Sequence, residues 1–377
     1  MRRVPHQLIV AFIVGLAVLA CAPATQPAPT PRTAPPAASA VAPPVPTIGA
    51  APARPTDAPL NPAMTVRVGV VGATGEAGLY IAEERGYFRE QGLTIEWAQF
   101  QAGQQMIPLL GAGQLDVGSG GVSAGLINAV ALDIPLRIVA DEGYIAPGSA
   151  WQGIVVRKEL VDNGTFRGCP DYKGLRVANT TDGNTGHIVL ARTLAECGLE
   201  LTDVEVVLMG FSDMMAAFQN GAIDASFMLE PFMTRGVADG LFVMSKRGGD
   251  AYPGQQGGII LYAPHFIANQ RAAGQRVMVA YLLGVRDFEA AFTRGVGRAK
   301  IIDILSRTTS IRDPALLDRM EPVNFNPDGY INVQAFGDDV AWWYDHGYTK
   351  TRVDPTQVVD HSFVDYAIER LGRYAPR

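Results

Sequence analysis

The pattern of apolar and polar positions beyond residue 64 alternates between two kinds of segment. Short runs rich in valine and leucine predict β-strands, and longer runs with apolar residues every three or four positions predict helices. The first unit is a strand at 65–71, a glycine-rich turn at 72–75 and a helix at 76–88. This order of elements is typical of an α/β unit.

Two consecutive series of such units follow along the chain. Further strands are predicted at 93–100, 115–117 and 136–140, and then at 154–156, 175–178, 204–208 and 222–229. Helices are predicted at 104–110, 122–132, 186–197 and 212–219, and beyond residue 269 at 271–292, 297–306, 314–320, 333–346 and 355–371. The expected fold is therefore α/β with two lobes, each a mixed sheet flanked by helices, and a helical C-terminal region.

The N-terminal segment has a different pattern. Arg2 and Arg3 precede an apolar run at 8–20 that ends at Cys21, which predicts a signal peptide over 1–20 and lipidation of Cys21, as in bacterial lipoproteins. Plain cleavage and an uncleaved anchor are the alternatives, although the run is shorter than the roughly 20 residues of a membrane span. Residues 21–63 are rich in Ala, Pro and Thr and predict a disordered linker.

Charge and cysteine content narrow the class of protein. The net charge is −6 for the full chain, and no basic stripe suggests nucleic-acid binding. Cys169 and Cys197 are the only cysteines after Cys21, and an oxidising compartment would allow them to pair. The five histidines are scattered, so we expect neither a metal site nor a cofactor.

Candidate chemistry lies in four loops that follow predicted strands, at 72–78, 118–123, 179–186 and 210–213. Ligands of α/β sheets bind beyond the carboxyl ends of strands, near helix N-termini. Ordinary turns and helix caps prefer the same residue types, which is the alternative explanation. The candidate ligand-binding residues of these loops and of the neighbouring segments are Thr74, Glu76, Tyr80, Ser119, Tyr144, Trp151, Thr181, Asn184, Thr185, Phe211 and Glu230.

A G-x-S-x-G match at 121–125 offers an alternative function. In α/β hydrolases such a motif holds the nucleophilic serine, here Ser123. Only about three strands precede it, and no oxyanion segment is recognisable. A secreted serine hydrolase is therefore a second hypothesis, and a sensor module without transport is a third.

Several segments together resemble a known family. They are GLYIAEERGYF at 78–88 with EQGLTIE at 90–96, LGAGQLDVG at 110–118, YKGLRVA at 172–178, and FQNGAIDA at 218–225 with EPF at 230–232. This combination resembles the ABC-importer substrate-binding proteins for nitrate, sulfonates, taurine and thiamine-type pyrimidine precursors. The enzymes that share this fold carry a clustered-cysteine motif, which this chain lacks.

The resemblance implies a two-lobed periplasmic binding protein fold of type II and no enzymatic activity. It places lobe 1 at 64–147 and 262–377 and lobe 2 at 148–261, joined by crossing segments at 142–151 and 255–262. The implied partners are a small-molecule ligand, an ABC permease with its ATPase, and the membrane through a lipid anchor on the extracytoplasmic side. The protein is expected to be a monomer.

The ligand class stays open between two chemistries. The loops carry the carboxylates Glu76, Asp182, Asp213 and Glu230, and the nearest cation is Arg235. Such carboxylates repel a small anion such as a sulfonate, nitrate or taurine. Aromatic residues at 80, 144, 151, 211 and 232 would instead stack on a flat heterocycle, such as a thiamine pyrimidine precursor or a flavin-like molecule.

Overall fold

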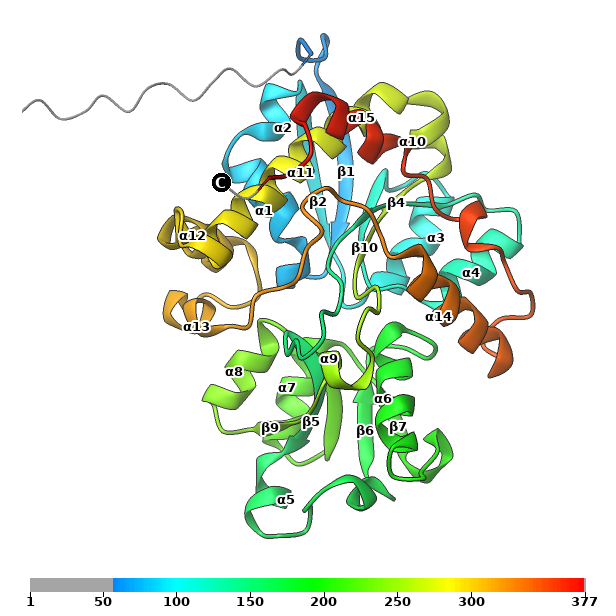
Figure 1. The fold of residues 1–377 in the computed structure, drawn as a ribbon, viewed down its shortest axis with the longest axis vertical. Helices are drawn as coiled ribbons and strands as arrows, with labels where there is room; N and C mark the ends of the chain where they lie inside the picture. Colours follow the sequence, from blue (N-terminus) through cyan, green and yellow to red (C-terminus); the bar gives the residue numbers. More distant parts are fainter. Residues whose placement is uncertain (1–56, 376–377) are drawn as a thin grey trace, which may run out of the picture. The chain divides into compact units, whose positions relative to one another are not determined.

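The computed structural model describes residues 57–375, which contain two five-stranded sheets (Figure 1). The sheet of lobe 1 has the order β2-β1-β3-β10-β4, with β1 (Met64–Val70), β2 (Leu93–Gln99), β3 (Val117–Gly120), β4 (Arg137–Asp141) and β10 (Ile259–Tyr262). The sheet of lobe 2 has the order β7-β6-β8-β5-β9, with β5 (Gln152–Arg157), β6 (Arg176–Asn179), β7 (Glu205–Leu208), β8 (Ala225–Leu229) and β9 (Phe242–Arg247). Both sheets are mixed, since β10 runs antiparallel to its neighbours, as does β5.

Helices flank both sheets, which confirms the predicted fold class. In lobe 1 they are α1 (Ala77–Glu84), α2 (Tyr87–Glu90), α3 (Met106–Gly111), α4 (Ala124–Ala131), α10 (Pro264–Asn269), α11 (Arg271–Arg294), α12 (Arg298–Thr308), α13 (Pro314–Arg319), α14 (Val333–Asp345) and α15 (Ser362–Leu371). In lobe 2 they are α5 (Lys158–Asp162), α6 (Thr185–Ala195), α7 (Phe211–Gln219), α8 (Phe232–Ala238) and α9 (Gly248–Ala251). Short 3-10 turns are η1 (Thr74–Glu76), η2 (Gly103–Gln105), η3 (Cys169–Tyr172), η4 (Leu201–Asp203) and η5 (Pro355–Gln357).

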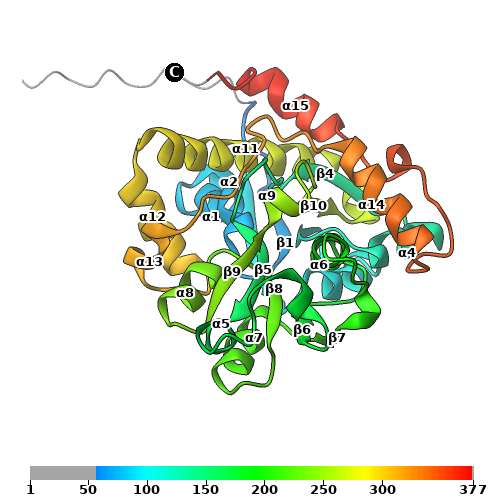
Figure 2. The ribbon, with the colours of Figure 1, turned by 60° about the horizontal axis from the view of Figure 1, so that its bottom comes forward.

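The long helix α11 organises the core of lobe 1. It crosses α1 so closely that a Cβ atom on Gly284 would lie 2.0 Å from the carbonyl oxygen of Gly78. Tyr281 and Val285 pack against Gly78 on either side of this crossing. Figure 2 shows α11 and α15 together on the same side of this lobe. The glycines therefore position α1, whose N-terminal turn forms part of the cleft described below.

Several sequence-based predictions differ from the structure. The helix predicted at 76–88 ends at Glu84, because Gly86 adopts a left-handed φ of 77° and α2 begins a new turn. The edge strand β9 and helix α8 have no counterpart among the predicted elements. β10 pairs with β3 and β4, so residues 259–261, predicted in lobe 2, belong to the sheet of lobe 1.

Two chain segments cross between the lobes, and a third lies against them. Gln256, which is fully buried, donates through Nε2 to Asp141 Oδ1 at 2.6 Å and to the carbonyl oxygens of Gly143 and Gly258. Its Oε1 accepts from the backbone N–H of Asn332 at 3.0 Å. These bonds tie the segment between α13 and α14 to both crossing segments. We call the region formed by residues 141–144, 255–258 and 332 the hinge.

The described part of the predicted linker is not free of the body. Leu60 donates its backbone N–H to the carbonyl of Gln91, and Arg276 donates to the carbonyl of Ala58. Asp57 accepts from Tyr366 and, at 2.8 Å, from Arg370. Residues 57–63 therefore pack on lobe 1, whereas the predicted signal peptide and Cys21 lie outside the described residues.

A disulfide bond joins Cys169 in η3 to Cys197 after α6, with a Cα–Cα distance of 5.5 Å. It closes a loop within lobe 2. No helix within residues 57–375 is long and apolar enough to cross a membrane.

Candidate functional site

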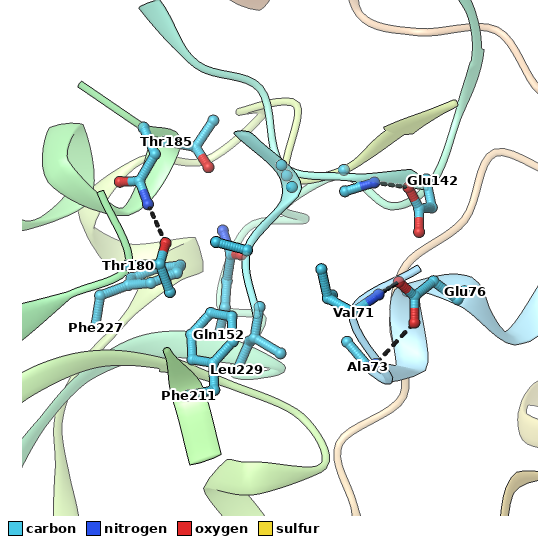
Figure 3. Close-up of a pocket in the computed structure, with 18 of the residues that line it drawn as sticks. Val71, Ala73, Glu76, Glu142, Gln152, Thr180, Thr185, Phe211, Phe227 and Leu229 are labelled. Atoms are coloured by element: carbon cyan, nitrogen blue, oxygen red, sulfur yellow. Dashed lines mark hydrogen bonds between the residues drawn. The ribbon is translucent and has the colours of Figure 1, made fainter. Parts of the chain in front are cut away.

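A cavity with about 630 Å³ of space free of atoms, part of it open to solvent, lies between the two lobes (Figure 3). Lobe 1 and the hinge contribute Val71, Ala73, Gly75, Glu76, Ala102, Gly103, Gln104, Gly120, Gly121, Glu142, Gly257 and Gly258. Lobe 2 contributes Trp151, Gln152, Thr180, Asn184, Thr185, Phe211, Phe227 and Leu229. A molecule in this space would contact both lobes at once.

The first polar group of the cavity is Glu76, at the end of the turn η1 that follows β1. The turn folds back so that the carboxylate accepts from the backbone N–H groups of Val71, Gly72 and Ala73, and from the Tyr80 hydroxyl at 2.9 Å. Burial raises the pKa of Glu76 to about 7, although these hydrogen bonds oppose the rise. Glu76 thus both shapes the turn and brings negative charge to the cavity wall.

The second carboxylate, Glu142, follows the last residue of β4. It accepts from the Ser119 hydroxyl and from the backbone N–H of Gly120 at 2.7 Å. Burial and the nearby charge of Glu76 raise the pKa of Glu142 well above its usual value. Gly75, beside Glu76, lies against Glu142, since a Cβ atom there would be in van der Waals contact with Glu142 Oε1 at 3.5 Å.

The opposite wall is formed by the start of helix α6. Asn184 caps this helix by accepting from the backbone N–H of His187 at 2.8 Å, and it exchanges hydrogen bonds with Asn179 at the end of β6. The same side chain donates to Thr180 Oγ1 at 2.8 Å, which leaves the Thr180 hydroxyl hydrogen for another acceptor. With Thr185 in the first turn, this wall offers hydroxyl groups and the positive end of a helix dipole.

Apolar side chains close the cavity between these two polar walls. Phe211 and Phe227 come from lobe 2, and Phe227 lies so close to Gly186 that a Cβ there would be 2.5 Å from its ring. Trp151 donates its indole N–H to the carbonyl of Tyr144 and covers Gly257. The cavity is therefore polar at both ends, and mainly apolar side chains lie between them.

Direct contacts hold the lobes together around the cavity. The backbone N–H of Ala124 donates to the carbonyl of Gly183 at 2.8 Å, and that of Thr185 donates to Val122. On the other side, the Thr74 hydroxyl donates to the carbonyl of Glu230 at 3.1 Å. The lobes are thus closed on each other.

The structure brings five of the candidate ligand-binding residues to the cavity: Glu76, Trp151, Asn184, Thr185 and Phe211. The other six lie outside its lining. Thr74 and Glu230 form the contact between lobes, Tyr80 and Ser119 donate to the two carboxylates, Tyr144 lies in the hinge, and Thr181 follows the lining residue Thr180. The polar atoms of Thr74, Tyr80, Ser119 and Glu230 thus form hydrogen bonds within the protein.

Other groups weighed in the sequence also lie elsewhere. Asp182 is exposed, Asp213 is exposed on α7, and Arg235 pairs with Asp239 on α8. Phe232 stacks behind Phe211, with ring centroids 5.6 Å apart. The lining residues absent from the prediction include Glu142, Gln152, Thr180 and Phe227. Glu142 carried a usable signal, because it directly follows a strand end, as the four candidate loops do.

Ser123 lacks the partner that a hydrolase needs. Its Oγ is buried and has no hydrogen-bond partner in the structure, and Ser123 begins helix α4 beside a smaller, separate cavity. A catalytic serine requires a base within hydrogen-bond reach. Among residues 57–375 no cluster of His, Cys, Asp and Glu suits a metal ion.

Comparisons with known proteins find related sequences. The model of the NMT1-like family matches residues 60–280. A protein of Escherichia coli K12, named as a candidate aliphatic sulfonates-binding protein, is 30% identical over 237 residues, which span 62% of this chain and 69% of that protein.

Solved structures share the fold. The alkanesulfonate-binding protein SsuA from Xanthomonas axonopodis pv. citri bound to MOPS superposes with a TM-score of 0.65 at 23% identity, covering 78% of this chain and 98% of that one. The periplasmic nitrate-binding protein NrtA from Synechocystis PCC 6803 has a TM-score of 0.70 at 16% identity, covering 84% and 90%.

Proposed function

Because this chain belongs to the NMT1-like family, we propose that it is an extracytoplasmic solute-binding protein of an ABC importer. It captures a small molecule between its lobes and delivers it to the permease that a cytoplasmic ATPase drives. The names of the sulfonate- and nitrate-binding relatives support this class of function.

The observation that carries the proposal is the cavity between the lobes. Both lobes line it, and backbone hydrogen bonds such as that from Ala124 to Gly183 join the lobes beside it. A ligand held by both walls binds the closed arrangement more tightly than the open one, and this difference in affinity sets how far it stabilises closure. The closed lobes then present a surface that a permease distinguishes from the open form.

The ligand classes suggested by the sequence fit this cavity unequally. No Arg, Lys or His is present among the described residues that line it, and two buried carboxylates are. A small anion such as nitrate therefore finds uncharged donors only, such as the helix N-terminus and hydroxyls of lobe 2 and the amide of Gln152. An aromatic heterocycle, such as a pyrimidine precursor, would lie between Phe211, Phe227 and Trp151.

Anchoring is the second part of the proposal. Cys21 after the apolar run at 8–20 would carry the lipid, and residues 22–56 would connect it to the described body. Labelling with a radioactive fatty acid tests this: the wild-type chain should incorporate the label and the Cys21→Ala variant should not. Labelling of that variant would refute the anchor without affecting the binding function.

Thermal unfolding of the purified protein tests the binding function. The panel contains nitrate, alkanesulfonates, taurine, aminopyrimidines, thiamine and flavins. A ligand at one hundred times its Kd adds about 2.7 kcal/mol, which raises the Tm by several degrees. A rise with one chemical class supports the proposal, whereas no rise with any member contradicts it.

A further inference from the structure

The cavity has two chemically opposite ends. Glu142 and Glu76 belong to the end formed by lobe 1, and Thr180 and Thr185 to the end formed by lobe 2 (Figure 3). The first end is rich in acceptors and negative charge, and the second is rich in donors. A ligand that satisfies both ends must itself be asymmetric.

Glu142 has unused acceptor capacity. A carboxylate has about four lone-pair positions, and the described structure gives Glu142 two donors, Ser119 and the backbone N–H of Gly120. Glu76 is more fully satisfied, with three backbone donors and Tyr80. Glu142 is therefore the group that accepts from a ligand, and Glu76 adds negative charge beside it.

No basic side chain compensates this pair within residues 57–375. Neither carboxylate forms a salt bridge there, and no Arg, Lys or His lines the cavity. The titratable groups that influence Glu142 are Glu76 and Asp141, and the electrostatic influence of Glu142 extends to Tyr80 and Tyr281. All of these are acids, so the charge of the pair is neutralised either by protonation or by a cation that a ligand brings.

A second observation indicates a ligand at the same place. The Nε2 of Gln152 is buried without any hydrogen-bond partner, although Gln152 is only 2% exposed and lines the cavity. Gln152 lies between the two polar ends in Figure 3. A buried donor without a partner is unfavourable because it has lost its hydrogen bonds to water, and an acceptor on a bound molecule would remove that penalty.

We infer that this cleft selects ligands with a cationic nitrogen group, which Glu142 binds beside Glu76, and with an acceptor group directed at Gln152 and the Thr180–Thr185 end. This inference rests on the proposed solute-binding function and specifies its ligand class. An aminosulfonate fits this description, as does a protonated aminopyrimidine, whereas a plain alkanesulfonate or nitrate does not. The nitrogen group, rather than the anionic group, decides which solutes are accepted.

Proton exchange gives an independent sign of this selection. Burial raises the pKa of both carboxylates in the closed cleft, so closure around an anion or a neutral molecule requires proton uptake near pH 7. A cationic nitrogen group stabilises the ionised carboxylates and removes that requirement. Calorimetry in buffers of different ionisation enthalpy measures the difference directly.

The experiment uses pairs of probes that differ only in nitrogen. Taurine is compared with isethionate, in which a hydroxyl replaces the amine, and 4-amino-5-hydroxymethyl-2-methylpyrimidine is compared with its 4-deamino analogue. Isothermal titration with the wild-type protein should give at least tenfold tighter binding for the aminated member of any pair that binds. The Glu142→Gln variant should reduce this ratio to less than about threefold.

Glu289→Gln is the matched control, since Glu289 on α11 is also a glutamate whose pKa burial raises but lies outside the cavity lining. It should leave the ratio unchanged, and circular dichroism verifies that both variants fold. Should Glu142→Gln fail to fold, the number of protons taken up by the wild type with the sulfonate pair decides: none with taurine, whose amine is already protonated at pH 7, and at least a fraction of one with isethionate.

The possible outcomes separate the two proposals. Equal or tighter binding of isethionate or of the deaminated pyrimidine overturns the selection for a nitrogen cation but leaves solute binding intact. An unchanged ratio in the Glu142→Gln variant also overturns it. Failure of every probe in the pairs and in the thermal panel overturns the binding function, and the selection with it.

Discussion

Gln256 connects both crossing strands and the segment before α14, so replacing it by alanine perturbs the hinge at one point. The variant loses the two N–H donors of the amide, which three acceptors share, and one accepted bond. The carbonyl of Gly143 keeps donors from Gly257 and Gly258, and that of Gly258 keeps the N–H of Glu142. The loss therefore falls mainly on Asp141 and on the backbone N–H of Asn332.

The magnitude depends on the charge of Asp141. Burial raises the pKa of Asp141 to about 7, so it is largely ionised at pH 8 and protonated at pH 5. A hydrogen bond to a charged group contributes about 1.5 to 3 kcal/mol and a neutral one about 1. Gln256→Ala should therefore lower the free energy of unfolding by about 3 kcal/mol at pH 8 and by about 1 to 2 kcal/mol at pH 5.

Urea denaturation followed by circular dichroism at both pH values measures this difference. The matched control is Gln334→Ala, which removes an exposed glutamine bound to Asp338 on α14 and should change stability by less than about 0.5 kcal/mol. Equal losses at pH 5 and pH 8 would refute the reasoning, because the amide would then not be holding an ionised Asp141.

Three further changes test other parts of the molecule. Replacing Cys169 and Cys197 by serine opens a loop with a sequence separation of 28 and should cost about 3 to 4 kcal/mol in urea unfolding; a loss below about 1 kcal/mol would contradict a constraint on the unfolded chain. Glu230 has its pKa raised to about 7 by burial, so its stabilising contribution is full below about pH 4.5 and is lost as the pH rises through 7. Glu230→Gln should therefore gain stability relative to the wild type between pH 5 and pH 8, by at most about 3 kcal/mol, and a pH-independent difference would be evidence against this. Phe211→Ala should weaken the binding of any cavity ligand about tenfold or more in calorimetry, whereas Ser123→Ala, outside the lining, should leave that affinity unchanged.

Much of the fold follows from local pattern. The strands at 64–70 and 93–99 lie within one residue of the predicted ranges at each end. Short apolar runs bounded by turn residues are a strong strand signal. The helix predicted at 76–88 is interrupted at Gly86, because the backbone there is left-handed and begins the separate helix α2. β9 was missed because an edge strand that ends in Lys246 and Arg247 has a weak apolar pattern.

The site was harder to predict than the fold. The loops after the strands were identified, and Asn184 and Thr185 lie in the cavity. Which of two adjacent loop residues faces the cavity depends on how the two lobes are placed against each other. Thr180 rather than Thr181 therefore lines the cavity. The interaction of Glu142 with Glu76 joins two segments that are far apart in the sequence, which no local pattern reveals.

The position of β10 imposes an order on assembly. β4 (Arg137–Asp141) pairs with no other strand of the described sheets than β10 (Ile259–Tyr262), and every strand of lobe 2 lies between them in the chain. The polypeptide emerges in sequence from a ribosome or an export channel. All strands of lobe 2 and both cysteines of its disulfide therefore emerge before the last strand of lobe 1. Until residue 262 arrives, β4 lacks its strand partner. A nascent chain halted before that point would present a complete second lobe beside an unfinished first one, and only the finished pair can grip a ligand.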